Sequence, residues 1–276
     1  MKFYNKTRVS KSIPKKLIRD KKFHLIPIYY LMMTSHLGRE GILNGGSYKF
    51  ADHIYAGKPK GKYIIGYLVD FIFLRLKSAN SFKFRYLSAK KEIEQFIKRV
   101  NKKENIHIAA IPSGYAREIF DIATKLKVEK HPKYEKIEWH LLDLDKKLLK
   151  EIKKGNELNH KINYLRGDAL AKSTYNKIRK LDLIVSMGFT EFLTDNQTLR
   201  FYKRINKQLN KGGIFITSGM ISHKLSEYLL RNIAELKTSY RNKEDLINLA
   251  QKSGFKLQKV YQDKNMIQTM MVLEKV

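Results

Sequence analysis

A small-residue turn and two acidic residues are the positions whose order along the chain indicates chemistry. The turn, Pro112–Gly114, separates the apolar run Ile106–Ile111 from a helical pattern. Asp143 follows the next strand-like run, and Asp168 follows the one after it. Ligands of open α/β sheets bind beyond the carboxyl ends of the strands, so these three positions would face one ligand. One carboxylate could accept both hydroxyl hydrogens of a ribose, and the other could accept from an adenine amine.

Each of these positions also has a purely structural interpretation. Asp143 could cap a helix that begins near Lys146, because Asp is a common N-cap residue. Asp168 follows Gly167 and could be a turn residue. Gly114 would be needed wherever the backbone takes a positive φ or approaches a ligand closely. The functional interpretation therefore depends on the ordered combination and not on any single residue.

Strand and helix patterns alternate from residue 105 onward, and these elements would bring the turn and the two acidic residues together. Strands are predicted at Ile106–Ile111, Glu138–Leu142, Ile162–Leu165, Leu181–Ser186 and Ile214–Ser218, and helices at Ala116–Lys127, Lys146–Lys154, Thr198–Leu209, Ser222–Glu235 and Lys243–Ser253. This order predicts an α/β fold with a mostly parallel sheet covered on both faces. The β-prone runs Lys256–Tyr261 and Met266–Glu274 flank a short turn, so the sheet should end in an antiparallel strand.

The first hundred residues have a different pattern. Residues 1–23 are basic and polar and predict a loose arm, whereas residues 24–100 predict mostly helix, with a turn at Gly57–Gly61. This region holds many aromatic and basic residues, of which we expect Tyr55 and Arg85 to face a site. Such residues can stack bases or surround a methylammonium group, but most of them could instead pack the helices onto the sheet.

Composition narrows the class of protein without identifying it. The chain has 276 residues, a formal charge of +30 and no cysteine, which excludes disulfides and thiolate chemistry. The charge would attract nucleic acid, anionic lipid or an acidic partner, or it could reflect a general bias toward lysine. No apolar run reaches the roughly 20 residues that a membrane-spanning helix needs, so we expect a cytoplasmic protein with no transmembrane segment. The eight histidines show no metal-ligand spacing, and no metal is expected.

Taken together, these motifs resemble those of class I S-adenosylmethionine (SAM)-dependent methyltransferases, and the resemblance covers residues 105–276. That family has a seven-stranded Rossmann-like sheet with an antiparallel last strand. Leu209–Gly219 resembles its KGG turn into strand five, and Lys252–Phe255 its turn into strand six. Gly45–Gly61 and Met187–Phe201 further resemble a bacterial subgroup of these methyltransferases. The resemblance implies two regions: residues 1–100, a helical substrate or lid region, and residues 101–276, the SAM-dependent methyltransferase domain.

The resemblance also implies which residues bind SAM and its product S-adenosylhomocysteine (SAH). The turn after the first strand would approach the methionine part, Asp143 would hold the ribose, and Asp168 with Ala169 would hold the adenine. The expected cofactor residues are Ala110, Pro112, Ser113, Gly114, Tyr115, Asp143, Leu144, Gly167, Asp168, Ala169, Ser186, Met187 and Gly188. The first motif departs from the family pattern: Ala110 replaces its acid, Pro112 its first glycine and Ala116 its third. Ser113 or Glu118 could substitute for the missing acid at the amino end of the cofactor.

The activity that the resemblance implies is methyl transfer to an oxygen or nitrogen nucleophile of a small molecule or lipid headgroup. An RNA substrate is the alternative that the charge favours, and a non-catalytic SAM-binding or scaffold protein is the one that the altered first motif favours. The catalytic candidates are Glu191, Ser186, Tyr55 and Arg85. Ser186 could instead bond the backbone at a strand end, and Glu191 could be a solvated or capping residue. The sequence leaves the oligomeric state open.

Overall fold

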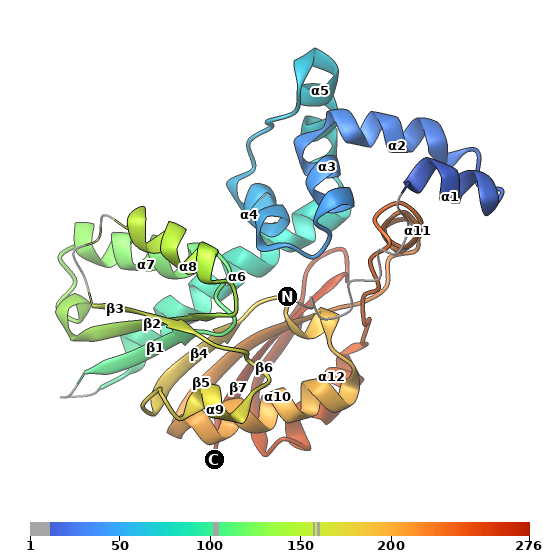
Figure 1. Cartoon of the computed structure of the whole chain (residues 1–276). Coiled ribbons are helices and arrows are strands. Elements are labelled where there is room, and N and C mark those ends of the chain that lie inside the picture. The colour runs from blue at the N-terminus through green and yellow to red at the C-terminus, as the bar shows by residue number, and fades with distance from the viewer. Residues whose placement is uncertain (1–11, 102–104, 157, 159–160) are drawn as a thin grey trace.

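A seven-stranded sheet forms the centre of the molecule, with a helical lobe above the carboxyl ends of its parallel strands (Figure 1). The computed structural model describes residues 12–101, 105–156, 158 and 161–276. The strands are β1 (Ile106–Ala110), β2 (Ile137–Asp143), β3 (Ile162–Arg166), β4 (Leu181–Ser186), β5 (Leu209–Met220), β6 (Phe255–Gln262) and β7 (Gln268–Lys275). Their order is β3-β2-β1-β4-β5-β7-β6. Strands β1 to β5 are parallel and β7 is antiparallel to both neighbours, which confirms the predicted Rossmann-like sheet.

Two strands begin more than one residue away from their predicted start. β5 begins at Leu209, five residues early, because Leu209 already pairs with Leu181 and a register shift absorbs the glycines before Ile214. β7 begins at Gln268, because the carboxylate of Asp263 accepts the backbone N–H groups of Ile267 and Gln268. Those two hydrogen bonds fix the turn of the terminal hairpin and delay the start of its second strand.

Helices cover both faces of the sheet, as the alternating pattern predicted. One face carries α6 (Lys77–Arg99), α7 (Arg117–Val128) and α8 (Lys146–Lys154), and the other carries α9 (Lys172–Tyr175), α10 (Asp195–Gln208) and α12 (Lys243–Gln251). The side chains of β1 alternate between the two layers: Ile106 and Ile108 lie in the first core and Ala109 in the second. This alternation is the period of two that a strand buried on both faces requires.

The helical lobe consists of α1 (Ile13–Arg19), α2 (Leu25–Thr34), α3 (His36–Leu43), α4 (Tyr48–Ala56) and α5 (Tyr63–Phe73). The predicted loose arm is wrong for Ile13–Arg19, where Ile13 and Leu17 share one helix face and are fully buried. They pack against Leu25 and against Ile233, which follows α11 (Lys224–Asn232). The part of the predicted arm between residues 1 and 11 lies outside the described residues.

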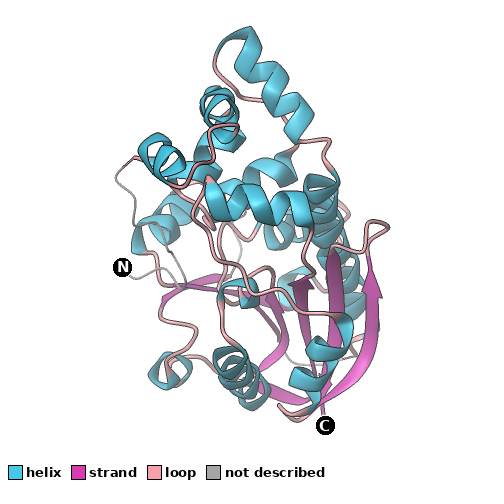
Figure 2. Ribbon diagram, turned by 90° about the vertical axis from the view of Figure 1, so that its right-hand side faces the viewer, coloured by secondary structure: helices cyan, strands magenta, loops and turns pink. Residues whose placement is uncertain are grey.

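Helix α6 connects the lobe to the sheet. Its residues Ala89, Ile93 and Ile97 are buried in the same core as β1. The expected division between residues 1–100 and 101–276 therefore assigns to the first region a helix that packs on the sheet. Figure 2 shows the resulting arrangement from the side, with the lobe stacked above one end of the sheet. Among the helices in the part of the chain that the structure describes, none has the length and apolarity to cross a membrane.

Candidate functional site

A cavity of about 260 Å³ lies between the carboxyl ends of the strands and helices α3 and α4 of the lobe. Eleven of the thirteen residues expected to bind cofactor line it: Pro112, Ser113, Gly114, Tyr115, Asp143, Leu144, Gly167, Asp168, Ala169, Met187 and Gly188. The other two, Ala110 and Ser186, are each about 1% exposed and do not reach the cavity wall. Residues predicted from four separate loops are thus brought to one surface.

The turn after β1 holds Asp143 in position. The backbone N–H of Gly114 donates to Asp143 Oδ2 at 3.0 Å, and the N–H of Asp145 donates to Oδ1 at 3.0 Å. Asp143 does not cap the following helix, because Asp145 is the N-cap of α8 and accepts from Lys147 and Leu148. Burial raises the pKa of Asp143, although the N–H groups of Asp145 and Gly114 oppose the shift. A carboxylate oxygen has two lone pairs, so each oxygen retains acceptor capacity toward the cavity.

The altered first motif has positive φ at two positions. Gly114 has φ +51°, as expected, and Ala116 has φ +47° at the position where the resemblance places a glycine. A left-handed conformation costs an L-residue roughly 1–2 kcal/mol, so the surrounding packing must hold Ala116 there. The N–H of Ala116 donates to the carbonyl of Ser113 at 2.9 Å, which closes the turn.

The two acidic loops lie next to each other. The N–H of Gly167 donates to the backbone carbonyl of Asp143 at 3.0 Å, which joins the end of β3 to the end of β2. Asp168 Oδ1 accepts the N–H of Leu170 at 2.8 Å, and the side chain lines the same cavity as Asp143. One ligand of nucleoside size could therefore contact both carboxylates.

Three of the four catalytic candidates form one buried cluster. Arg85 Nη1 donates to Glu191 Oε1 at 2.8 Å, and Arg85 Nε and Nη2 donate to the hydroxyl of Tyr55 at 3.1 and 2.8 Å. Both ion-pair side chains are almost fully buried, and the three residues line the cavity from α6, α4 and the turn Thr190–Phe192. The fourth candidate, Ser186, lies outside this cluster, beneath the wall.

The cluster has a defined protonation state. Burial raises the pKa of Tyr55, and the charge of Arg85 only partly offsets the shift, so the phenol is neutral. Burial by itself would lower the pKa of Arg85, but Tyr55 and Glu191 raise it more, and the guanidinium stays charged. Gly188 makes room for this arrangement, because a Cβ at that position would lie 2.6 Å from Arg85 Nη1.

Glu118 is a second buried acid on the cavity wall. It lies in the first turn of α7 with 8% of its surface exposed. Burial raises its pKa to about 7, against opposing contributions from its own backbone N–H and from Arg85. A carboxyl with a pKa near neutrality is a common feature of functional sites, because such a group can take up or release a proton near pH 7.

Among the aromatic and basic residues of the N-terminal region, sequence reasoning expected only Tyr55 and Arg85 to face the site, and it expected nothing from the segment after β5. Tyr48 and Phe50 come from α4, Phe82 from α6, and Leu230, Leu236 and Thr238 from α11 and the chain after it. Arg117 from α7 also lines the cavity and makes a two-point ion pair with Asp52, at 2.7 and 3.0 Å. Aromatic enrichment of residues 48–86 was the available signal for part of this wall, but no pattern marked residues 230–238.

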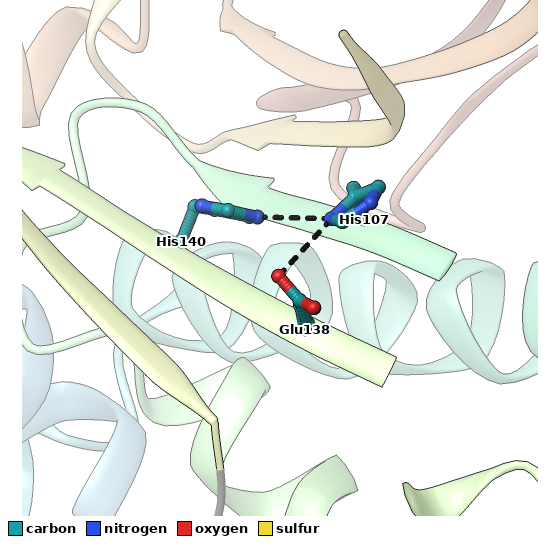
Figure 3. A group of neighbouring side chains, drawn as sticks. All are labelled: His107, Glu138 and His140. Carbon is teal, nitrogen blue, oxygen red and sulfur yellow. Dashed lines mark hydrogen bonds and ion pairs between the residues drawn. The ribbon is translucent and has the colours of Figure 1, made fainter. Parts of the chain in front are cut away.

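A separate group of side chains with metal-binding chemistry lies in β1 and β2: His107, Glu138 and His140 (Figure 3). The distance from His107 Nδ1 is 3.3 Å to His140 Nε2 and 3.6 Å to Glu138 Oε2. Burial and the neighbouring His107 lower the pKa of His140 to about 4, so that its ring is neutral. Sequence spacing did not reveal the group, because the parallel register pairs His107 with Glu138 across two strands. None of the three lines the cavity.

The fold and the cavity define a class I methyltransferase, and comparisons with known proteins agree. A family model described as "Putative methyltransferase" matches residues 5–273, and the chain belongs to this family. No curated protein matches the sequence.

Three solved structures illustrate the likeness in fold. A possible exported protein from Bordetella parapertussis has a TM-score of 0.72 and 15% identity over 92% of this chain and 86% of that one. The CurJ carbon methyltransferase has a TM-score of 0.60 and 14% identity over 97% and 72% of the two chains. The magnesium protoporphyrin IX methyltransferase from Synechocystis PCC 6803, which holds SAH, has a TM-score of 0.57 and 8% identity over 86% and 97%.

Proposed function

We propose that the protein transfers a methyl group from SAM to an oxygen or nitrogen nucleophile of a small molecule or a lipid headgroup. The observation that carries this proposal is the composition of the single cavity described above. Its lining combines residues of the loops after β1, β2 and β3 with aromatic and aliphatic side chains from the lobe. The helical N-terminal region would thus select the substrate.

The residues at the strand ends fit SAM. Asp143 would accept from the ribose hydroxyls and Asp168 from the adenine amine, since both carboxylates line the cavity. Glu118 would take the place of the acid that Ala110 replaces. Its buried carboxyl has a pKa of about 7 and forms no ion pair with the residues that the structure describes, so a cofactor ammonium could supply that partner. When bound, SAM supplies an electrophilic methyl group, so the protein needs chiefly to orient the nucleophile toward it.

The Tyr55–Arg85–Glu191 cluster would orient the substrate. Arg85 donates to both of its partners, which leaves the Tyr55 hydroxyl hydrogen available to an acceptor in the cavity. Glu191 is the candidate general base for a hydroxyl substrate, whereas an amine substrate can react without one. The surrounding Phe82, Phe189 and Phe192 would pack against the apolar part of the substrate and exclude water.

RNA is the second candidate substrate, and the charge of +30 is the observation that favours it. The cavity wall does not, because its basic side chains among the described residues, Arg85 and Arg117, are already paired with Glu191 and Asp52. Phosphate contacts require cations that can exchange counterions for the nucleic-acid backbone. We therefore place RNA after a small molecule or lipid headgroup.

The test combines binding and turnover. Calorimetry with SAM and SAH should show binding to the wild-type protein, and its absence for both ligands would refute a SAM-dependent activity and leave a scaffold role. Methyl-labelled SAM is then incubated with the protein and with separate lipid, small-molecule and RNA fractions of a bacterial extract. Label in the lipid or small-molecule fraction supports the proposal, whereas label confined to RNA, with binding that falls steeply with salt, would favour the alternative.

A further inference from the structure

The outer face of α5 is apolar, whereas its only charged residue is buried. Ile64, Ile65, Tyr67, Leu68, Phe71 and Ile72 are all exposed, with Ile64 at 78%. Asp70, by contrast, is fully buried and accepts hydrogen bonds from the hydroxyl of Ser35 and the N–H of Leu37. This polarity is the reverse of that expected for a surface helix in water.

The inward face of α5 is fixed by close backbone packing. A Cβ at Gly66 would lie 2.3 Å from the carbonyl oxygen of Thr34, the last residue of α2. The N–H of Lys62 donates to that same carbonyl at 3.0 Å. The last turn of α2 therefore lies beside α5, and Tyr30 and Leu31 near the end of α2 also have exposed apolar side chains. Figure 1 shows α5 at the end of the lobe farthest from the sheet.

Exposed basic residues flank this face at both ends. Lys58, Lys60 and Lys62 precede α5, and Arg75 and Lys77 follow it. Between residues 57 and 78 the only acidic residue is the buried Asp70. A contiguous apolar surface of this kind marks an interaction site, and its basic border requires an anionic partner.

We propose that α5 and the end of α2 dock onto an anionic lipid bilayer surface, with the apolar side chains in the acyl boundary and the flanking lysines among the headgroups. The helix has 11 residues, well short of the about 20 needed to span a bilayer, so it would lie in the plane of the interface. A second copy of the chain is a poorer occupant. Because both ends of α5 are basic, either a parallel or an antiparallel pair would bring like charges together.

The docking face is connected directly to the cavity. Helix α4 lines the cavity, and the loop Gly57–Gly61 leads from it into α5. The inference does not depend on the proposed function, because membrane binding can be measured without SAM or a methyl acceptor. Failure of vesicle binding would leave the methyltransferase assignment intact, and failure of methyl transfer would leave the membrane-docking proposal intact.

The experiment measures sedimentation of the whole protein with vesicles of phosphatidylcholine containing about a third phosphatidylserine, at about 0.15 M salt, where the Debye length is roughly 8 Å. The wild-type protein should bind, and binding to pure phosphatidylcholine should be at least tenfold weaker. The triple variant Ile64→Gln/Leu68→Gln/Ile72→Gln leaves the net charge unchanged and should lower the partition coefficient by tenfold or more. The matched control places three glutamines at exposed apolar positions elsewhere, Leu87, Val128 and Met266, and should bind like the wild type.

A fluorescent reporter can locate the contact. The single tryptophan, Trp139, is fully buried, so Tyr67→Trp would report on α5 against a constant background. Its emission should shift to shorter wavelength on addition of the anionic vesicles. Equal vesicle binding by the α5 triple variant and the matched control would overturn the proposal, since general attraction by the +30 charge would then suffice. A wild-type dimer in light scattering that only the α5 variant abolishes would overturn it in favour of a second copy.

Discussion

Glu118→Gln should stabilise the free protein at alkaline pH while weakening its binding of SAM. The carboxyl of Glu118 is buried, and its pKa is raised from 4.5 to about 7. At about 1.4 kcal/mol for each pKa unit, the charged carboxylate costs the folded state about 3 kcal/mol relative to the neutral form. Glutamine has the shape of the protonated side chain and carries no charge, so the substitution removes this cost.

The direction of the pH dependence follows from the raised pKa. Below pH 4.5 the carboxyl is protonated in the folded and the unfolded chain, and wild type and variant should be equally stable. As the pH rises from 4.5 to 7, the wild type loses about 3 kcal/mol of unfolding free energy that the variant keeps, and above pH 7 the difference between them no longer changes. Urea denaturation followed by circular dichroism between pH 4 and pH 8 measures this difference. A difference that stays constant with pH would refute the assignment of a raised pKa to Glu118.

Binding of SAM should show the opposite preference. If the ammonium group of the cofactor pairs with Glu118, binding favours the carboxylate and releases a proton below pH 7. Calorimetry in buffers of different ionisation enthalpy should detect this proton for the wild type and not for Glu118→Gln. If Glu118→Gln instead removes the pH dependence of the turnover rate and leaves that of the SAM affinity, Glu118 does not contact the cofactor. It would then be a general base.

Three further substitutions test the rest of the site. Asp143→Ala should weaken SAM binding by about 1–3 kcal/mol in calorimetry, because charge-assisted hydrogen bonds to the ribose are lost; unchanged affinity would disprove that role. Glu191→Gln removes the counter-ion of buried Arg85 and should lower the unfolding free energy in urea by about 3 kcal/mol, with partial recovery when Arg85 is also replaced by methionine. Gly188→Ala places a Cβ 2.6 Å from Arg85 Nη1 at a φ of +74°, and thermal denaturation should show a loss of about 1–3 kcal/mol. Wild-type stability of that variant would mean that Arg85 moves freely.

The sheet and the loops at its strand ends were predictable because their signals are local. Helix α8 has the predicted bounds Lys146–Lys154, and four strand ends carried recognisable turns or acids. The parallel register then brings those strand ends together without any further information. Positive φ at Gly114 was also expected from the residue type, whereas the same conformation at Ala116 could not be inferred, because alanine does not favour it.

The part of the cavity wall formed by Tyr55, Arg85 and Glu191 could be predicted only in part, because its contacts join distant segments. Tyr55, Arg85 and Glu191 were each singled out, but Arg85 and Glu191 are 106 positions apart, and their pairing follows from how α6 crosses the sheet. The raised pKa of Glu118 depends on burial by the lobe, which no local pattern encodes. The apolar run of α5 was visible in the sequence, but its period did not reveal which face would point outward.

Helix α6 packs on the sheet and also contributes to the cavity beneath the lobe, so the lobe and the sheet cannot separate independently of it. The same helix buries Ile93 and Ile97 beneath the sheet and carries Arg85 to the cavity, so it cannot swing open without uncovering both a hydrophobic layer and a buried ion pair. Access for substrate would therefore come from movement of the shorter helices α3 and α4. Divergence in substrate choice should likewise concentrate in those two helices and spare α6, and a fragment that begins at residue 101 should not fold on its own.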